Sequence, residues 1–216
     1  MAKTAYPTEI EFHAYLSDAG FSAAFLALLD LETALAAGQS TFEEMTGRRM
    51  LATTQTREFD PPSNSWRDLD LKTDLLSVTG LTVGATALIS GTDYRLLPYN
   101  AADDGRPYNM VRFNRWWTPP PTWAERGSVV ITGSWGFGTT IPEAAWQGIL
   151  TLAGLSLFPA IAQSRTRGIQ MWREADVTEQ YGADPLGSLR DNWSRYAMGV
   201  DGRGGVVGMY RRVTQG

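Results

Sequence analysis

The stretch Ser128–Phe158, SVVITGSWGFGTTIPEAAWQGILTLAGLSLF, decides the fold that we predict for this chain. It begins with a β-branched run, Val129 to Thr132, which is typical of a strand. After a glycine-rich turn, Pro142 and Glu143 suit the first turn of a helix, where proline loses no hydrogen bond and a carboxylate complements the helix dipole. The helix is apolar on most sides, so we expect it to be central to the core until Pro159 kinks or ends it.

Before residue 50 the sequence predicts helices. Thr8 and Glu11 have the spacing of a capping box, Ser22 can cap a second helix, and Thr41 with Glu44 repeats the capping pattern. Glycine then supplies the expected ends. The apolar stripe of the second helix, which Glu32 interrupts, is Phe25, Leu28, Leu29 and Leu35. The expected segments are Thr8 to Gly20, Ser22 to a break at Gly38, and Thr41 to Gly47.

The residues from Met50 to Thr132 form short β-branched and aromatic runs separated by Pro, Gly, Asn and Asp. This pattern is typical of antiparallel strands joined by turns. We therefore expect a small β-domain inserted between helical segments. Its predicted strands are Thr53–Phe59, Arg67–Leu71, Leu75–Val83, Ala85–Ile89, Tyr94–Leu97, Met110–Phe113 and Val129–Thr132.

The C-terminal part begins with a second helix signal, Asp184-Pro185, and ends in the glycine-rich tail Gly199–Gly216, which we expect to become ordered only on a partner. The predicted fold class is α+β, with a helical bundle core, an inserted antiparallel β-domain and an extended C-terminal segment. The predicted divisions are 1–49 for the N-terminal helices, 50–140 for the β-domain, 141–165 for the core helix and 166–216 for a C-terminal docking segment.

Composition excludes several classes of protein. The 216 residues include no cysteine, so the chain has neither a disulfide nor a thiolate nucleophile. A net charge of -4 argues against a general nucleic-acid binder, and we find neither a signal pattern nor an apolar run long enough for a membrane span. No Lys or Arg lies between Thr4 and Gly47, where the charged residues are Glu9, Glu11, Asp18, Asp30, Glu32, Glu43 and Glu44.

No arrangement of residues predicts catalysis, a metal site or a cofactor. His13 is the only histidine, and Asp103-Asp104-Gly105 lacks the alternating ligands of a calcium loop. A hydrolase that used Asp103 and Asp104 as its carboxylate pair is disfavoured, because adjacent residues in a turn rarely flank one scissile bond. The glycines after Thr132 follow no phosphate-binding pattern. We therefore expect no enzyme.

Two aromatic groups suggest recognition. Trp116, Trp117, Trp123 and Trp135 form either a sugar-stacking platform or, as is commoner, core or interface packing. A second group has the composition of an interface hot spot. It contains Trp193, Tyr196 and Tyr210 with Arg195, Arg211 and Arg212.

Several segments in order resemble the head-to-tail connector proteins of tailed bacteriophages, also called adaptor or head-completion proteins. Glu43-Glu44-Met45-Thr46-Gly47-Arg48 matches their Glu-x-x-Thr-Gly-Arg signature, and Leu75–Val83 matches a strand of their β-insertion. The family ending, a strand followed by Thr-Gly, aromatic-Gly and Pro-Glu before a long helix, is matched by Thr132-Gly133, Trp135-Gly136 and Pro142-Glu143.

The resemblance implies a structural protein of the virion neck, assembled in the host cytoplasm, of which about twelve copies form a ring between portal and tail. Its partners would be the portal protein, the next neck or tail protein, further copies of itself and, without sequence-specific binding, the genomic DNA that passes through the lumen; no membrane is implied. Another neck or tail-completion protein and a carbohydrate-binding β-module are the alternatives. We expect portal docking by Trp193, Arg195, Tyr196, Met209, Tyr210, Arg211 and Arg212, and an acidic channel lining by Glu9, Glu11, Asp30, Glu43 and Glu44.

Overall fold

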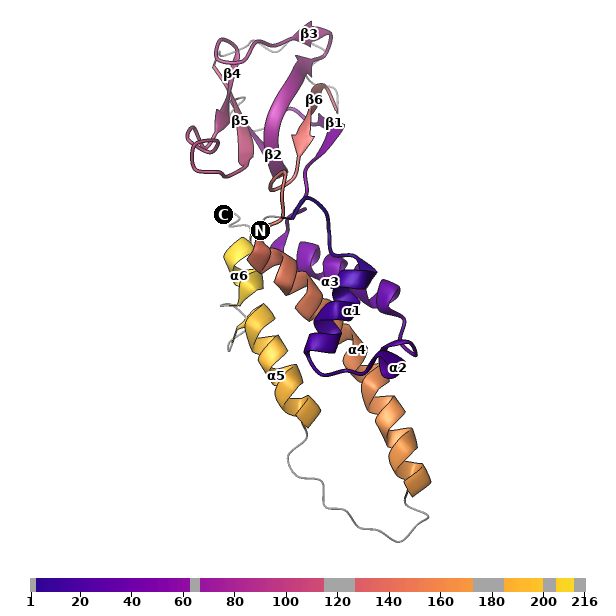
Figure 1. Cartoon of the computed structure of the whole chain (residues 1–216). Coiled ribbons are helices and arrows are strands. Elements are labelled where there is room, and N and C mark those ends of the chain that lie inside the picture. The colour runs from indigo at the N-terminus through magenta and orange to yellow at the C-terminus, as the bar shows by residue number, and fades with distance from the viewer. Residues whose placement is uncertain (1–2, 63–66, 115–126, 173–184, 200–204, 212–216) are drawn as a thin grey trace. The chain divides into compact units, whose positions relative to one another are not determined.

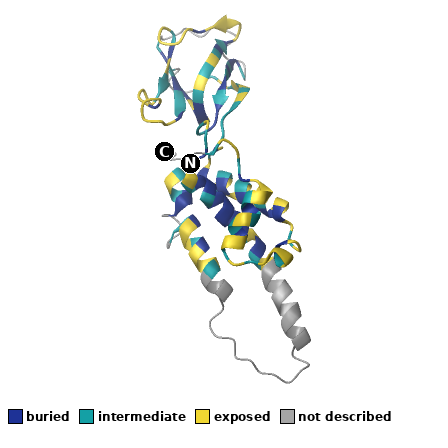
Figure 2. Cartoon of the chain, in the orientation of Figure 1, coloured by how far each residue is buried: buried dark blue, intermediate teal, exposed yellow. Residues whose placement is uncertain are grey.

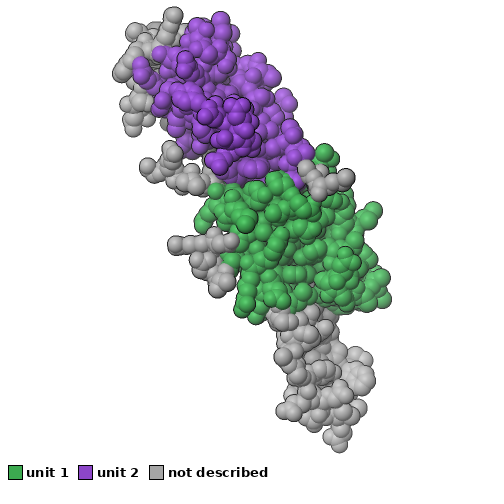
Figure 3. All heavy atoms as spheres, turned by 60° about the vertical axis from the view of Figure 1, so that its left-hand side comes forward, with its two compact units in different colours: residues 1–47, 142–216 green, residues 48–141 purple. Residues whose placement is uncertain are grey.

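The protein folds into two compact units, one helical and one built on a sheet. The computed structural model describes residues 3–62, 67–114, 127–172, 185–199 and 205–211, with backbone alone for 160–172 and 185–188. Residues 1–47 and 142–216 form the helical unit, and residues 48–141 form the sheet unit (Figure 3). The mixture of helices and antiparallel sheet is the predicted α+β class (Figure 1).

The first two helices begin at the predicted caps. Helix α1 is Glu9–Asp18 and carries the complete capping box: the Glu11 N–H donates to Thr8 Oγ1 at 3.3 Å, and the Thr8 N–H donates to the Glu11 carboxylate at 3.0 Å. Helix α2, Ala23–Leu26, is capped by Ser22, whose hydroxyl accepts from the Phe25 N–H. Both capping predictions are confirmed.

Helix α3, Leu31–Thr46, corrects the predicted helix break at Gly38. The break lies at Asp30, whose carboxylate caps α3 by accepting from the Thr33 N–H at 3.0 Å. Gly38 is buried inside α3, because a Cβ there would lie 2.5 Å from the Ala153 backbone nitrogen. Thr41 is consequently an exposed residue of the helix interior rather than a cap.

Helix α4, Glu143–Trp172, is the central helix of the helical unit and starts at the predicted position. Its first half is buried on several sides, as Figure 2 shows, and includes Ala145, Ile149, Leu150 and Ala153. Pro159 lies inside the helix and is exposed. Of the two predicted effects of Pro159, an end of the helix is therefore wrong, and a kink stays a prediction. No helix in the described part of the chain is long and apolar enough to cross a membrane.

Helices α5, Pro185–Met198, and α6, Val206–Tyr210, pack against α4 and against each other. Val206 and Val207 of α6 are buried in the helical unit. The described residues of the tail, 205–211, are therefore folded in the single chain, which corrects the expectation of an extended segment that is ordered only on a partner. Burial of these two valines stabilises the folded segment, although the residues around them are rich in glycine.

The sheet unit is one antiparallel sheet with the strand order β1-β6-β2-β5-β4, and β3 pairs with β2. The strands are β1 (Thr53–Phe59), β2 (Asp68–Val83), β3 (Thr86–Ala87), β4 (Tyr94–Leu97), β5 (Tyr108–Phe113) and β6 (Val129–Trp135). Strand β2 is a single strand where two were predicted. It is interrupted by a register shift between Asp70 and Leu75, and Lys72 there has a φ of 55°.

Candidate interaction surfaces

The Glu-x-x-Thr-Gly-Arg motif forms the first passage of the chain between the units. Thr46 Oγ1 donates to the Phe42 carbonyl at 2.7 Å, and Gly47 ends α3 with a φ of 65°, a conformation that favours glycine. Arg48 begins the sheet unit, where its Nη1 donates to the Asp74 carboxylate at 2.9 Å. Since Asp74 is only 5% exposed, this ion pair is largely removed from water.

The Trp135-Gly136 motif precedes the point where the chain returns to the helical unit, and it lies beside the residues that follow Arg48. The Phe137 N–H donates to the Arg49 carbonyl at 2.8 Å, and the Ala52 N–H donates to the Gly138 carbonyl at 2.9 Å. Gly136 has a φ of 147°, and a Cβ there would lie 2.5 Å from the Ala52 Cα. The outgoing and returning segments are thus hydrogen-bonded to each other within the sheet unit.

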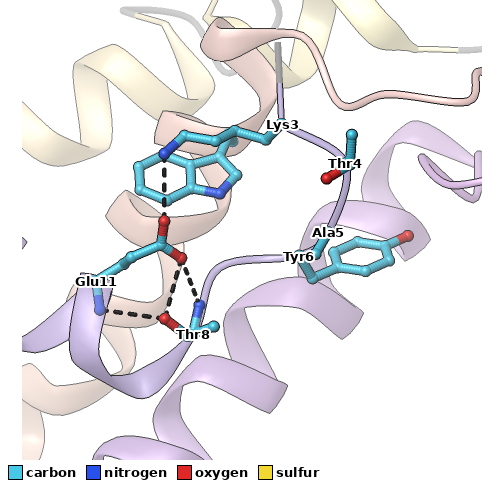
Figure 4. A pocket seen from close by; sticks show the side chains of 7 residues that line it. Lys3, Thr4, Ala5, Tyr6, Thr8 and Glu11 are labelled. Atoms are coloured by element: carbon cyan, nitrogen blue, oxygen red, sulfur yellow. Dashed lines mark hydrogen bonds and ion pairs between the residues drawn. The ribbon is translucent and has the colours of Figure 1, made fainter. Parts of the chain in front are cut away.

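Of the five predicted channel residues, Glu11 and Glu43 are used within the helical unit. Besides its capping bonds, the Glu11 carboxylate pairs with Lys3 Nζ at 3.2 Å (Figure 4). The Tyr6 hydroxyl donates to the Glu43 carboxylate. The hydrogen bond from the Thr8 backbone, followed by the Lys3 contact, holds the pKa of Glu11 below its usual value. These two carboxylates have structural partners.

The other three channel candidates are exposed. The cap bond from the Thr33 N–H lowers the pKa of Asp30, so this side chain also has a structural role. The Glu9 and Glu44 side chains form no hydrogen bond or ion pair within the described residues. Their role as channel residues remains a prediction, and they are the two candidates free to serve it.

Lys3 closes a hollow between the N-terminal segment, α1 and α4 (Figure 4). The hollow is lined by Lys3, Thr4, Ala5, Tyr6, Thr8, Glu11 and Trp146. Lys3 Nζ lies 4.3 Å from the centroid of the Trp146 ring, so its charge contacts both an aromatic face and the Glu11 carboxylate. These contacts hold the N-terminal segment against the helices. Among the described residues that line the hollow, Lys3 is the one cation, and it is already paired.

The predicted docking residues differ in exposure. Trp193 is 8% exposed and packs into the notch at Gly154, with ring centroids 5.6 Å from Tyr15 and 5.6 Å from Phe158. Trp193 therefore belongs to the core of the helical unit. The side chains that remain on the surface of α5 and α6 and of the residue after them are Arg195, Tyr196, Met209, Tyr210 and Arg211, while Arg212 lies outside the described residues.

The two tyrosines of this surface lie close to charged or ionisable neighbours. Tyr196 is 44% exposed, and partial burial together with the charge of Glu143 raises the pKa of its phenol. Tyr210 packs against Phe42 at 6.2 Å between ring centroids, and burial raises its pKa, with a smaller contribution from Tyr196. Both phenols are therefore neutral at physiological pH.

Among the four tryptophans of the proposed sugar platform, Trp135 is described and is 1% exposed. Its indole N–H donates to the Gln55 carbonyl at 3.0 Å, and the Arg57 guanidinium lies 4.5 Å from its ring. Trp135 is thus a core residue and presents no free ring face. Trp116, Trp117 and Trp123 lie outside the described residues.

The residues considered for catalysis do not converge. His13 is half-buried on α1, with Nδ1 3.5 Å from Ser17 Oγ, and Asp103 and Asp104 are exposed in the loop that Gly105 closes with a φ of 63°. Within the described ranges, no group of three or more His, Asp or Glu side chains could hold a metal ion.

The exposure of Leu28 was not predicted from the sequence. Leu28 was assigned to a buried stripe, but it is 80% exposed because the helix ends after Leu26 and restarts at Leu31. The signal was present: Asp30 precedes Leu31 as a cap should, and a cap at that position would have ended the preceding helix.

Comparison with known proteins gives structural neighbours only. No family model and no curated protein matches the chain. Three similar solved structures are "Virion of native gene transfer agent (GTA) particle" (TM-score 0.49, 19% identity, covering 100% of this chain and 97% of that chain), "Neck of empty GTA particle computed with C6 symmetry" (0.47, 16%, 100% and 97%) and "Neck of native GTA particle computed with C12 symmetry" (0.46, 16%, 100% and 98%).

Proposed function

We propose that this chain is a structural protein of the neck of a tailed phage or phage-like particle. In this proposal several copies form a closed ring that joins the portal to the tail and lets DNA pass through its lumen. The chain acts by shape and paired charges, without catalysis. The portal protein and the next neck or tail protein are its partners.

One observation carries the proposal: the motifs that resemble the connector family lie where the sheet unit is inserted into the helical unit. The units meet in sequence at Gly47/Arg48, within the Glu-x-x-Thr-Gly-Arg motif, and at Ile141/Pro142, directly before the Pro-Glu motif. Arg48 and Gly136 have specific local roles there, an ion pair and a positive φ. The residues that carry the resemblance therefore have defined structural uses in this chain, which supports the proposal.

For DNA passage, Glu9 and Glu44 are the best candidates in the channel wall. Both are exposed, and the segment from Thr4 to Gly47 contains no Lys or Arg that could bind phosphates. An acidic wall repels the DNA backbone, so the duplex slides without adhering.

The decisive experiment mixes the purified chain with the portal ring of the same particle and measures the mass of the complex by size exclusion with light scattering. We expect the portal to gain one ring of chains, visible as an added tier in electron micrographs. No binding to the portal, with no ring at any concentration, would refute the proposal.

The channel role has a separate test in assembled particles. Glu9→Arg with Glu44→Arg should leave assembly intact and slow DNA ejection. Asp103→Arg with Asp104→Arg, in an exposed loop of the sheet unit, makes the same change in charge and serves as the matched control. Unchanged DNA retention and ejection in the first of these double variants would remove Glu9 and Glu44 from the channel.

A further inference from the structure

We propose that successive copies of the chain bind head to tail through two complementary surfaces of the helical unit, an inference that rests on the ring of the proposed function. The first, the acidic corner, consists of Asp18, Phe21, Phe25, Leu28 and Glu32. The second, the arginine face, consists of Arg195, Tyr196, Met209, Tyr210 and Arg211. The occupant of each surface is the other surface on a second copy.

The acidic corner presents apolar side chains inside an acidic border. Leu28 is 80% exposed, and Phe21 and Phe25 stack beside each other at 6.0 Å between ring centroids while remaining half-buried. Asp18 and Glu32 are exposed and form no hydrogen bond or ion pair within the described residues. Exposed apolar groups with a charged border are the usual composition of a protein interface.

The arginine face has the same organisation with a mainly basic border, beside which the carboxylate of Glu143 lies close to Tyr196. Met209 is 75% exposed and lies on α6, which contacts α5 with its half-exposed Tyr196. Arg195 and Arg211 are exposed, and neither forms an ion pair in the part of the chain that the structure describes. Aromatic residues, Met and Arg are the residue types enriched at interfaces.

The two surfaces are at opposite ends of α3. Leu28 precedes the first residue of α3, Leu31, whereas Tyr210 packs on Phe42 near its last turn. Eleven residues of helix separate Leu31 from Phe42, about 16 Å along the axis. Figure 1 also shows α2 and α6 on different sides of α4. One copy can therefore use both surfaces at once.

Charge decides which surfaces pair. Two acidic corners would bring carboxylates together and two arginine faces would bring guanidinium groups together, and like charges at an interface are unfavourable. A corner against a face pairs opposite charges around apolar centres. Such a heterologous contact repeats from copy to copy and closes into a ring when the rotation permits. This self-complementarity favours a second copy over the portal as the occupant of the arginine face.

Cysteine cross-linking tests the pairing directly, because the natural chain has no cysteine. Leu28→Cys and Met209→Cys should each give no cross-linked dimer alone with a short bis-maleimide. Mixed 1:1, they should give dimers, and the double variant should give a ladder. Ile89→Cys, exposed in the sheet unit, is the matched control and should give none. Dimers from either single variant alone would overturn the proposal, as would cross-linking of Met209→Cys to portal subunits in the portal complex.

Charge exchange provides a second test. Asp18→Arg with Glu32→Arg makes both surfaces basic, and Arg195→Glu with Arg211→Glu makes both acidic, so each variant should self-associate about tenfold more weakly. A 1:1 mixture should recover association to within about twofold of the natural chain. Failure to recover, with both variants folded by circular dichroism, would overturn the pairing.

The pairing of the two surfaces and the neck function can be refuted independently of each other. If the natural chain forms a ring with the portal but the cross-links appear elsewhere, the surfaces are wrong and the neck function stands. If the natural chain neither binds the portal nor associates with itself, both are wrong.

Discussion

The helical unit and the sheet unit reach a buried core by different means. In the sheet unit, alternate residues of neighbouring strands fill the core, as in β6, where Val129, Ile131 and Trp135 are buried and the residues between them are less so. In the helical unit, helices approach closely at glycines: Gly38 receives Ala153, and Gly154 receives Trp193. Both cores join residues that are distant in sequence. In the sheet unit, the local alternation of each strand marks which residues are buried, whereas in the helical unit burial depends on which partner faces each glycine.

The largest effect should come from removing the central tryptophan of either unit. Trp135→Ala and Trp193→Ala should each lower the free energy of unfolding by about 3–5 kcal/mol, because a large cavity replaces a buried ring. Hydrogen exchange with mass spectrometry should show lost protection mainly in the unit that carries the substitution. Equal loss in both units would show that they unfold as one.

A methyl group added at Gly38 of the helical unit should have a different effect from one added at Gly80 of the sheet unit. Gly38→Ala should destabilise the helical unit by about 2 kcal/mol despite alanine's higher helix propensity, because its Cβ would collide with the Ala153 backbone. Gly80→Ala, on β2, is the control, since a Cβ there meets nothing within 4 Å. Thermal unfolding measures both, and a stabilised Gly38→Ala variant would contradict the close approach of α3 and α4.

A smaller effect is expected for Tyr15→Phe in the helical unit. Thr151 Oγ1 donates to the Gln147 carbonyl, so the Tyr15 hydroxyl donates to Thr151 at 3.1 Å, and its loss should cost about 1 kcal/mol. Burial raises the pKa of this phenol, so its contribution is complete below about pH 10 and is lost as the pH rises through the folded value. Denaturant unfolding should show less alkaline destabilisation in the variant than in the natural chain.

The smallest effect concerns the half-buried pair Asp68–Arg112 of the sheet unit, with Nε and Oδ1 2.7 Å apart. The hydrogen bonds from Arg112 lower the pKa of Asp68. Its stabilisation is therefore present above about pH 4 and is lost as the pH falls through the folded value. When the pH is lowered below about 4, the urea midpoint should fall less steeply for Asp68→Asn than for the natural chain. An equal fall in both would show that solvent screens the pair completely.

The same contrast explains what could be predicted from sequence. Strands β1 and β4 have the predicted bounds, because alternation and turn residues are local signals. The predicted gap between two strands falls at Lys72, where the chain does bulge but the strand continues. In the helical unit, Gly38 was read as a breaker because its partner, Ala153, lies far along the chain.

The candidate surfaces follow the same rule. The aromatic and basic residues of α5 and α6 were found from composition, but burial of Trp193 depends on Gly154, which no local pattern connects to it. The acidic block was visible in the sequence, whereas the internal partners of Glu11 and Glu43 required the fold. The exposure of Leu28 depended on one capping residue, Asp30.

Insertion of residues 48–141 between α3 and α4 also sets an order of events during synthesis. The apolar side of α3, with Leu31 and Phe42, is complete long before the ribosome has made α4, which covers it. The sheet unit is contiguous, so we expect it to fold first and the N-terminal helices to wait for α4, open to chaperones meanwhile. Pulse proteolysis of stalled nascent chains should therefore find residues 48–141 protected while α1–α3 are still cleaved; earlier protection of α1–α3 would contradict this order.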